Sequence, residues 1–167
     1  MDESSAQAQW RMWLDDHASR FLLFARQKAR SEADAQDLVQ EAVLEAAQHS
    51  GNGMPPPLPA VYATIHRRAI DWARAEDRRQ GRELAAHDDA PQAWFDTTIE
   101  ERERAHCVQN AMSRLPEIYR EVVTLKIWAG LTFAEIADAL CIPTNTAASR
   151  YRYGLEQLRK FTREVVI

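Results

Sequence analysis

The stretch LTFAEIADALCIPTNTAASRYRYGLEQLRK, residues 131–160, decides the fold. Thr132 is followed three residues later by Glu135, which predicts a capping box at the start of a short helix. The sequence CIP at 141–143 ends that helix, and a longer helix is expected over 144–163. A short capped helix, a tight turn and a longer polar helix form the pattern of a helix-turn-helix.

The second helix of this motif carries the side chains that we expect to face DNA. Its first turns would enter the major groove, so they need groups that reach base edges and phosphates. The candidates are Asn145, Thr146, Ser149, Arg150 and Arg152. The helix has a net charge of +4 over 144–163, in a chain whose net charge is -4. The alternative interpretation is that these arginines only keep a surface helix soluble. The capped helix and turn before them favour DNA binding.

The remainder of the chain also favours helix. Gly and Pro are few, and Ala, Leu, Arg, Glu and Gln are abundant, so we expect an all-α fold. Upstream of the motif, the apolar spacing predicts helices over 99–115 and 116–129. Pro116 is placed as the first residue of the second of these, where its missing N–H costs nothing.

The first half of the chain predicts a separate group of helices. Apolar spacing over 6–30 predicts two helices or one bent helix, with 17–19 as the candidate break. Ser31 is a plausible N-cap for a helix that reaches about His49. The proline-rich loop at 52–59 is expected to be stiff and extended, and a helix resumes near Leu58 and continues to about Arg79.

The segment 81–98 separates the two groups. It reads GRELAAHDDAPQAWFDTT, with no helical stripe, one proline and a cluster of acids. This composition is typical of a flexible linker, although Trp94 and Phe95 suggest that part of it packs against another surface. We therefore predict two small helical domains, over 1–80 and 99–167, joined by a linker over 81–98.

An acidic run marks the helix that follows Ser31. No Lys or Arg occurs from 32 to 45, and Asp37, Glu41 and Glu45 repeat every four residues on one face. Like charges at this spacing cost helix stability unless a partner uses them, and a basic protein surface is the natural partner. A solvated acidic face is the commoner explanation for such a run taken alone.

A basic segment follows at 66–82, HRRAIDWARAEDRRQGR, with a net charge of +3. Basic residues beside Trp72 suit a DNA backbone with a stacking aromatic. A single Trp at helical spacing is more often part of a core, and that interpretation of Trp72 stays open.

Composition excludes several classes of protein. The hydrophobic content of 46% and charged content of 28% are those of an ordinary folded chain. Cys107 and Cys141 belong to no CxxC or Cys/His cluster, so we expect neither a disulfide framework nor a metal site. The N-terminus lacks a signal-peptide pattern and no stretch is long enough to span a membrane, so we expect a cytoplasmic protein. The histidines have no metal spacing, and neither a catalytic constellation nor a cofactor motif is evident.

Three ordered motifs resemble the sigma-70 family of the minimal extracytoplasmic-function type. ADAQDLVQEAVLEA at 33–46 is similar to the family's polymerase-clamp-binding helix. PAVYATIHRRAIDWAR at 59–74 is similar to its helix for the minus-ten promoter element, and 115–159 to its minus-thirty-five domain. The resemblance implies two domains, sigma region 2 and sigma region 4, and a sigma factor without chemistry of its own.

The resemblance also implies site residues. Contacts to the polymerase core would fall on Asp37, Leu38, Gln40 and Glu41. Contacts to the minus-ten element would fall on Arg67, Arg68, Asp71, Trp72, Arg74 and Arg78. The residues already assigned to DNA on the last helix would read the minus-thirty-five element, and the loop at 52–59 would capture a flipped base.

The implied partners are the RNA polymerase core, promoter DNA and an anti-sigma factor, with the free chain a monomer. Cys141 stands where the family commonly has a turn glycine, Ala147 and Ala148 replace a frequent Val and Lys, and Arg67 replaces an Asn. Two alternatives stay open. A sigma mimic would sequester an anti-sigma factor without initiating transcription, and a plain helix-turn-helix regulator would explain only 115–163.

Overall fold

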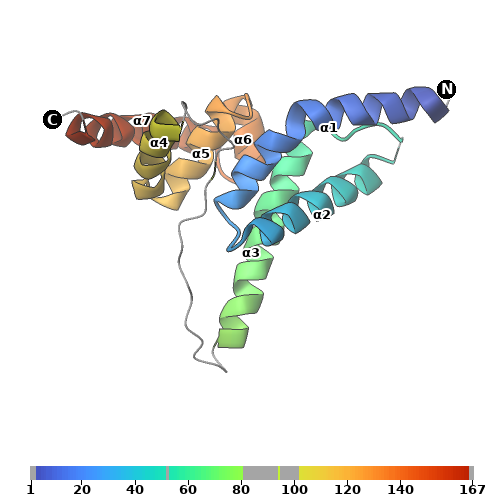
Figure 1. The fold of residues 1–167 in the computed structure, drawn as a ribbon, viewed down its shortest axis with the longest axis horizontal. Helices are drawn as coiled ribbons and strands as arrows, with labels where there is room; N and C mark the ends of the chain where they lie inside the picture. Colours follow the sequence, from blue (N-terminus) through green and yellow to red (C-terminus); the bar gives the residue numbers. More distant parts are fainter. Residues whose placement is uncertain (1–2, 52, 81–93, 95–101, 166–167) are drawn as a thin grey trace. The chain divides into compact units, whose positions relative to one another are not determined.

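The computed structural model describes residues 3–51, 53–80, 94 and 102–165, and these ranges contain helices and no strand (Figure 1). The helices are α1 (Glu3–Arg26), α2 (Glu32–Ser50), α3 (Leu58–Gln80), α4 (Arg102–Arg114), α5 (Glu117–Ile127), α6 (Phe133–Leu140) and α7 (Thr144–Val165). The all-α expectation is confirmed. The chain divides into two compact units, the first containing α1–α3 and the second containing α4–α7.

The first unit is held together by the apolar faces of α1, α2 and α3, each of which contacts the other two. Its centre is aromatic: the rings of Phe21 and Phe24 meet the Tyr62 ring edge-on, at centroid distances of 5.1 and 5.6 Å. The second half of α3 extends past α1 and α2 (Figure 1), which leaves much of its surface exposed.

Local signals fix the helices of this unit. The Ser31 side chain accepts a hydrogen bond from the Asp34 N–H (3.1 Å), and the left-handed Gly51 (φ 64°) ends α2. α1 is a single helix through 17–19, where the His17 ring lies 5.6 Å from Trp13 and 6.2 Å from Phe21. The break expected there does not occur within α1.

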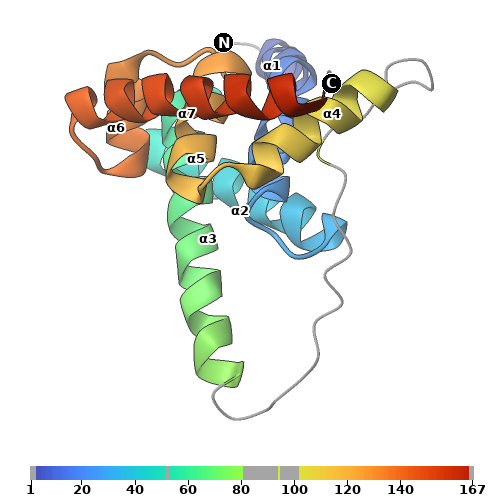
Figure 2. The same cartoon turned by 90° about the vertical axis from the view of Figure 1, so that its left-hand side faces the viewer.

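The second unit is organised by α7, which contacts α4, α5 and α6 (Figure 2). Gly154 lies buried in the middle of α7, at its close approach to α5. A Cβ atom there would lie 2.7 Å from Val123 Cγ2, so any other residue requires a shift of the Val123 side chain or of the helices. α5 begins at Glu117, and Pro116 occupies the N-cap position rather than the first helical position.

Trp94 belongs to the predicted linker but lies buried in the second unit. Its backbone N–H donates to Gln109 Oε1 on α4 (3.2 Å), and the guanidinium of Arg120 lies 5.4 Å from its ring centroid. Part of the predicted linker therefore docks on a helical unit. Phe95 and the rest of 81–98 lie outside the described residues.

Candidate functional site

The helix-turn-helix consists of α6, the turn at 141–143 and α7. Thr132 and Glu135 form the predicted capping box: the Thr132 N–H donates to Glu135 Oε2 (2.7 Å), and the Glu135 N–H donates to Thr132 Oγ1 (3.2 Å). Hydrogen bonds from the Thr132 backbone and side chain hold the pKa of Glu135 below its usual range. The capping-box prediction is confirmed, and it fixes the residue at which α6 begins.

Cys141 makes the turn in the left-handed conformation, with φ 54° and ψ 46°. Its N–H donates to Asp138 O (3.3 Å), and the Ile142 N–H donates to Ala137 O (3.0 Å), which closes the end of α6. The residue therefore adopts the strained backbone that glycine would adopt freely.

Cys141→Gly is expected to stabilise the second unit by about 0.5–1 kcal/mol, because the left-handed strain is relieved while some chain entropy is lost. Urea denaturation followed by circular dichroism measures the change. Cys141→Ala is the control, since alanine also lacks the thiol but keeps a Cβ, and it should bring no gain. Equal midpoints for the glycine and alanine variants would contradict the backbone explanation.

The structure brings four predicted DNA-facing residues to one place. Asn145, Thr146, Ser149 and Arg150 of α7 line an open hollow of about 330 Å³, here termed the recognition hollow. The same hollow is lined by Ile118, Tyr119 and Tyr153. Arg152 is exposed, and its guanidinium lies 5.1 Å from the Tyr153 ring centroid. Polar, basic and apolar groups therefore converge at the start of the second helix of the motif.

The two alanines that depart from the family pattern have different surroundings. Ala147 is 0% exposed, so its side chain packs inside the second unit and has no access to a phosphate. Ala148 is half-buried, so a longer basic side chain at this position could reach solvent. Of the two alanines, only Ala148 therefore stands where the side chain of a lysine could extend to the surface.

Two of the three acids on the acidic face of α2, Glu41 and Glu45, have partners in the same chain. Arg68 of α3 bridges two carboxylates, with Nη1 2.5 Å from Glu41 Oε2 and Nε 2.7 Å from Glu45 Oε2. Arg67 also pairs with Glu45. The like-charge cost on α2 is therefore offset by two arginines of α3, which are basic partners within the same chain.

The outer side of the same helix remains available. Asp37 and Gln40 are exposed, and Glu41 keeps 44% of its side chain exposed despite the ion pair. Leu38 is 0% exposed and packs in the core of the first unit. Leu38 therefore has no exposed surface for the direct contact expected from the resemblance. It instead supports the helix that carries the exposed groups.

The stability of the α1–α3 unit is expected to fall as the pH drops below about 4.5. Burial raises the pKa of Glu45, but hydrogen bonds and positive charge from Arg68 and Arg67 outweigh it and hold that pKa below the ordinary value of 4.5. As the pH falls, the Glu45 carboxylate is therefore protonated in the unfolded chain before it is protonated in the folded chain. The stabilisation present at neutral pH is lost as the pH falls through the folded pKa.

Solvent screening keeps this contribution under about 1 kcal/mol. The free energy of unfolding between about pH 7 and pH 3 should therefore fall less steeply for Glu45→Gln than for the native chain. Parallel pH dependences in the two proteins would show that the α2–α3 ion pairs contribute nothing.

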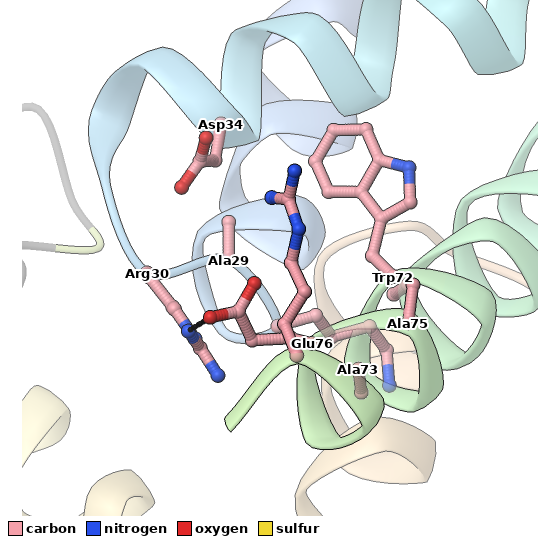
Figure 3. Close-up of a pocket in the computed structure, with 10 residues that line it drawn as sticks. Ala29, Arg30, Asp34, Trp72, Ala73, Ala75 and Glu76 are labelled. Carbon is pink, nitrogen blue, oxygen red and sulfur yellow. Dashed lines mark ion pairs between the residues drawn. The ribbon is translucent and has the colours of Figure 1, made fainter. Parts of the chain in front are cut away.

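The second half of α3 has two different faces. Asp71, Arg74, Asp77 and Arg78 line an exposed hollow on one side. Trp72 is half-buried and lines another cavity, of about 400 Å³, shared with residues of the α1–α2 connection (Figure 3). Arg30 forms an ion pair with Glu76 at this cavity (3.0 Å). Among the predicted minus-ten residues, the structure gathers Asp71, Arg74 and Arg78 and sets Trp72 apart.

The proline-rich loop is attached to α1. The indole N–H of Trp10 donates to the carbonyl oxygen of Gly53 (2.8 Å), and Gly51 and Gly53 both have positive φ. Trp10 also meets Trp13 edge-on, at a centroid distance of 5.7 Å. This residue was not selected from the sequence, because a contact across 43 residues leaves no local signal.

The residues Ile118, Tyr119 and Tyr153 were also missed from the sequence. Tyr153 lies seven residues after Thr146, and that spacing places the two on one helical face. The sequence therefore indicates that Tyr153 shares a helical face with Thr146, whereas the position of Ile118 of α5 beside these residues depends on tertiary packing.

Other site types find no support in the described part of the chain. No group of three or more His, Cys, Asp and Glu residues there is arranged to hold a metal ion. Cys107 and Cys141 are exposed and not disulfide-bonded. Among the described helices, none has the length and apolar character needed to cross a membrane.

Comparisons with known proteins agree with this architecture. A family model described as "Sigma-70, region 4" matches residues 105–158. The ECF RNA polymerase sigma factor SigK of Mycolicibacterium vanbaalenii is 31% identical over 139 residues, covering 81% of this chain and 70% of that protein. SigK of Mycobacterium ulcerans is 31% identical over 138 residues, covering 80% and 73%.

Two solved structures share the fold. The sigma factor RpoE of Bartonella quintana, solved in complex with the anti-sigma factor NepR, has a TM-score of 0.65 and 17% identity, covering 92% of this chain and 96% of that one. CnrH, solved in complex with the cytosolic domain of CnrY, has a TM-score of 0.61 and 18% identity, covering 96% and 94%.

Proposed function

Because the chain belongs to the sigma-70 family, as a member of its extracytoplasmic-function (ECF) group, we propose that it binds core RNA polymerase and directs transcription initiation at specific promoters. The observation that carries this proposal is the convergence of Asn145, Thr146, Ser149 and Arg150 at one exposed hollow of a helix-turn-helix. A cationic helix with hydrogen-bonding groups at its start fits the major groove of DNA.

The two units would have different binding functions. The first, over 1–80, would bind polymerase through Asp37, Gln40 and Glu41 and would meet the minus-ten element through the exposed face of α3. The second, over 99–167, would read the minus-thirty-five element. The loop at 52–59 would receive a flipped base, with Trp10 holding its backbone.

The division of contacts on α3 follows from its two faces. Asp71, Arg74 and Arg78 are exposed together and would meet DNA. Arg67 and Arg68 also occupy α3, but their ion pairs with Glu45 and Glu41 tie them to α2. They would contribute to DNA binding mainly by fixing the angle between the polymerase-binding helix and the DNA-binding helix.

The polymerase would complete the activity. The chain supplies no catalytic residue in this proposal, and RNA synthesis belongs to the core enzyme. A free chain with two DNA-binding units on a linker over 81–98 would bind promoter DNA weakly, and core polymerase would fix their separation and raise the effective concentration of the second unit at its site. The same exposed faces would be covered by an anti-sigma factor in the cytoplasm.

Selection from a random-sequence DNA library tests the proposal. Holoenzyme reconstituted from this chain and core polymerase should enrich duplexes with two conserved elements, whereas core alone and the free chain should not. Enrichment by the free chain alone would favour a plain helix-turn-helix regulator. Complex formation without any enrichment would favour a sigma mimic.

A further inference from the structure

Two large apolar side chains stand exposed at the recognition hollow. Ile118 is 44% exposed and Tyr153 is 47% exposed, and both line the hollow beside Asn145 and Ser149. An exposed apolar patch among hydrogen-bonding and basic groups is typical of a binding surface rather than of a solvated one. The residues expected to hydrogen-bond to base edges therefore have an apolar neighbour.

The Tyr153 ring is held in place from two directions. The Tyr119 ring of α5 lies 6.4 Å away at an interplanar angle of 45°, and the Arg152 guanidinium lies 5.1 Å from the Tyr153 centroid. Tyr119 is itself half-buried between α5 and α7. These contacts restrict the orientations of the Tyr153 ring, which reduces the conformational entropy that it loses when it meets a ligand.

Charge identifies the ligand that meets this surface. The hollow lies at the start of α7, which has a net charge of +4 over 144–163 in an acidic chain. A polyanion is therefore the fitting partner, and the side chains of Asn145, Ser149 and Arg150 match the donors and acceptors of base edges. Duplex DNA satisfies both requirements.

The major groove of DNA offers an apolar side chain one characteristic group, the C5-methyl of thymine. We propose that Ile118 and Tyr153 form an apolar contact for a thymine methyl group in the upstream promoter element, and so help to determine its sequence. The inference rests on the proposed function. It adds two specificity-determining residues and the chemical group that they recognise.

Replacement of thymine by deoxyuridine tests this directly, since it removes only the methyl group. The probe is the duplex that holoenzyme selects from the random library, with each thymine of its upstream element replaced in turn. At one position, replacement should weaken binding of the native holoenzyme about fourfold, the size expected for one methyl group removed from an apolar contact. Ile118→Ala and Tyr153→Ala should bind both duplexes nearly equally.

Two controls separate this contact from other effects. Tyr153→Phe keeps the ring and loses the hydroxyl, so it should retain the preference for thymine. Ile127→Ala truncates another exposed isoleucine of α5, 48% exposed and absent from the hollow lining, and should also retain it. Thermal unfolding of each variant verifies that the second unit is folded.

Indifference of native holoenzyme to every deoxyuridine replacement would overturn the inference. An unchanged preference in both alanine variants would overturn it equally, by assigning the methyl contact to other residues. If holoenzyme enriched no DNA beyond core alone, the proposed function would fail first, at the selection step, and the inference with it.

Discussion

Gly154→Val is expected to destabilise the α4–α7 unit by about 3 kcal/mol, a large part of the stability of a small helical unit. The added Cβ would lie 2.7 Å from Val123 Cγ2 and 3.4 Å from Tyr119 Cβ. Val123 is 0% exposed and cannot swing into solvent. The stiff side chain of Val123 or the two helices must therefore shift, and a shift of the helices also disturbs the recognition hollow through Tyr119.

Urea denaturation measures this loss. Gly154→Ala should be destabilised less, because the gain in helix propensity, about 1 kcal/mol, partly offsets the smaller clash. Arg159→Val is the matched control, since it places the same β-branched side chain at an exposed position of α7 and should cost only a few tenths of a kcal/mol. A Gly154→Val protein with the native midpoint would show that α5 and α7 do not pack this closely.

Asp37→Arg is expected to weaken binding to core polymerase about a hundredfold, because the reversal places a positive charge against the basic surface that this face would meet. Asp37 is exposed and no ion pair to it occurs among the described residues. Glu41 shares its charge with Arg68, and Glu45 lies between two arginines. Charge-neutralising substitutions should therefore rank in their effect as Asp37, then Glu41, then Glu45.

Titration of fluorescently labelled chain with core polymerase gives the affinities. Asp15→Arg is the control: it makes the same change in net charge at an exposed position of α1 and should leave the affinity close to native. Equal losses for Asp37→Arg and Asp15→Arg would mean that net charge, rather than the face of α2, drives the association.

The elements that could be predicted from sequence are those fixed by local chemistry. Thr132 with Glu135 and Ser31 with Asp34 act within a few residues, and each marks a helix start where expected. The helix-turn-helix follows from such signals. The conformation of Cys141 was indicated only by the resemblance, which places a turn glycine at this position, because a non-glycine residue by itself gives no indication of positive φ.

Contacts between distant residues limited the site prediction. The ion pairs of Glu41 and Glu45 with α3 span 22 to 27 residues, so the acidic run looked unpartnered in sequence. Helical spacing does separate Trp72 from Asp71 by about 100°, and this alone indicates that the two face different directions. The same spacing places Leu38 on the apolar side of α2, where it is 0% exposed, although the resemblance to a binding motif includes it among the contacts.

Run-off transcription with purified core polymerase on a genomic fragment library tests the central claim most directly. The account predicts discrete transcripts that require the native chain, are absent with core alone, and are lost when Asp37 and Glu41 are both replaced by arginine. Absence of transcripts from every fragment, with the native chain nonetheless bound to core, would contradict promoter-directed initiation and assign the chain to the sigma mimics.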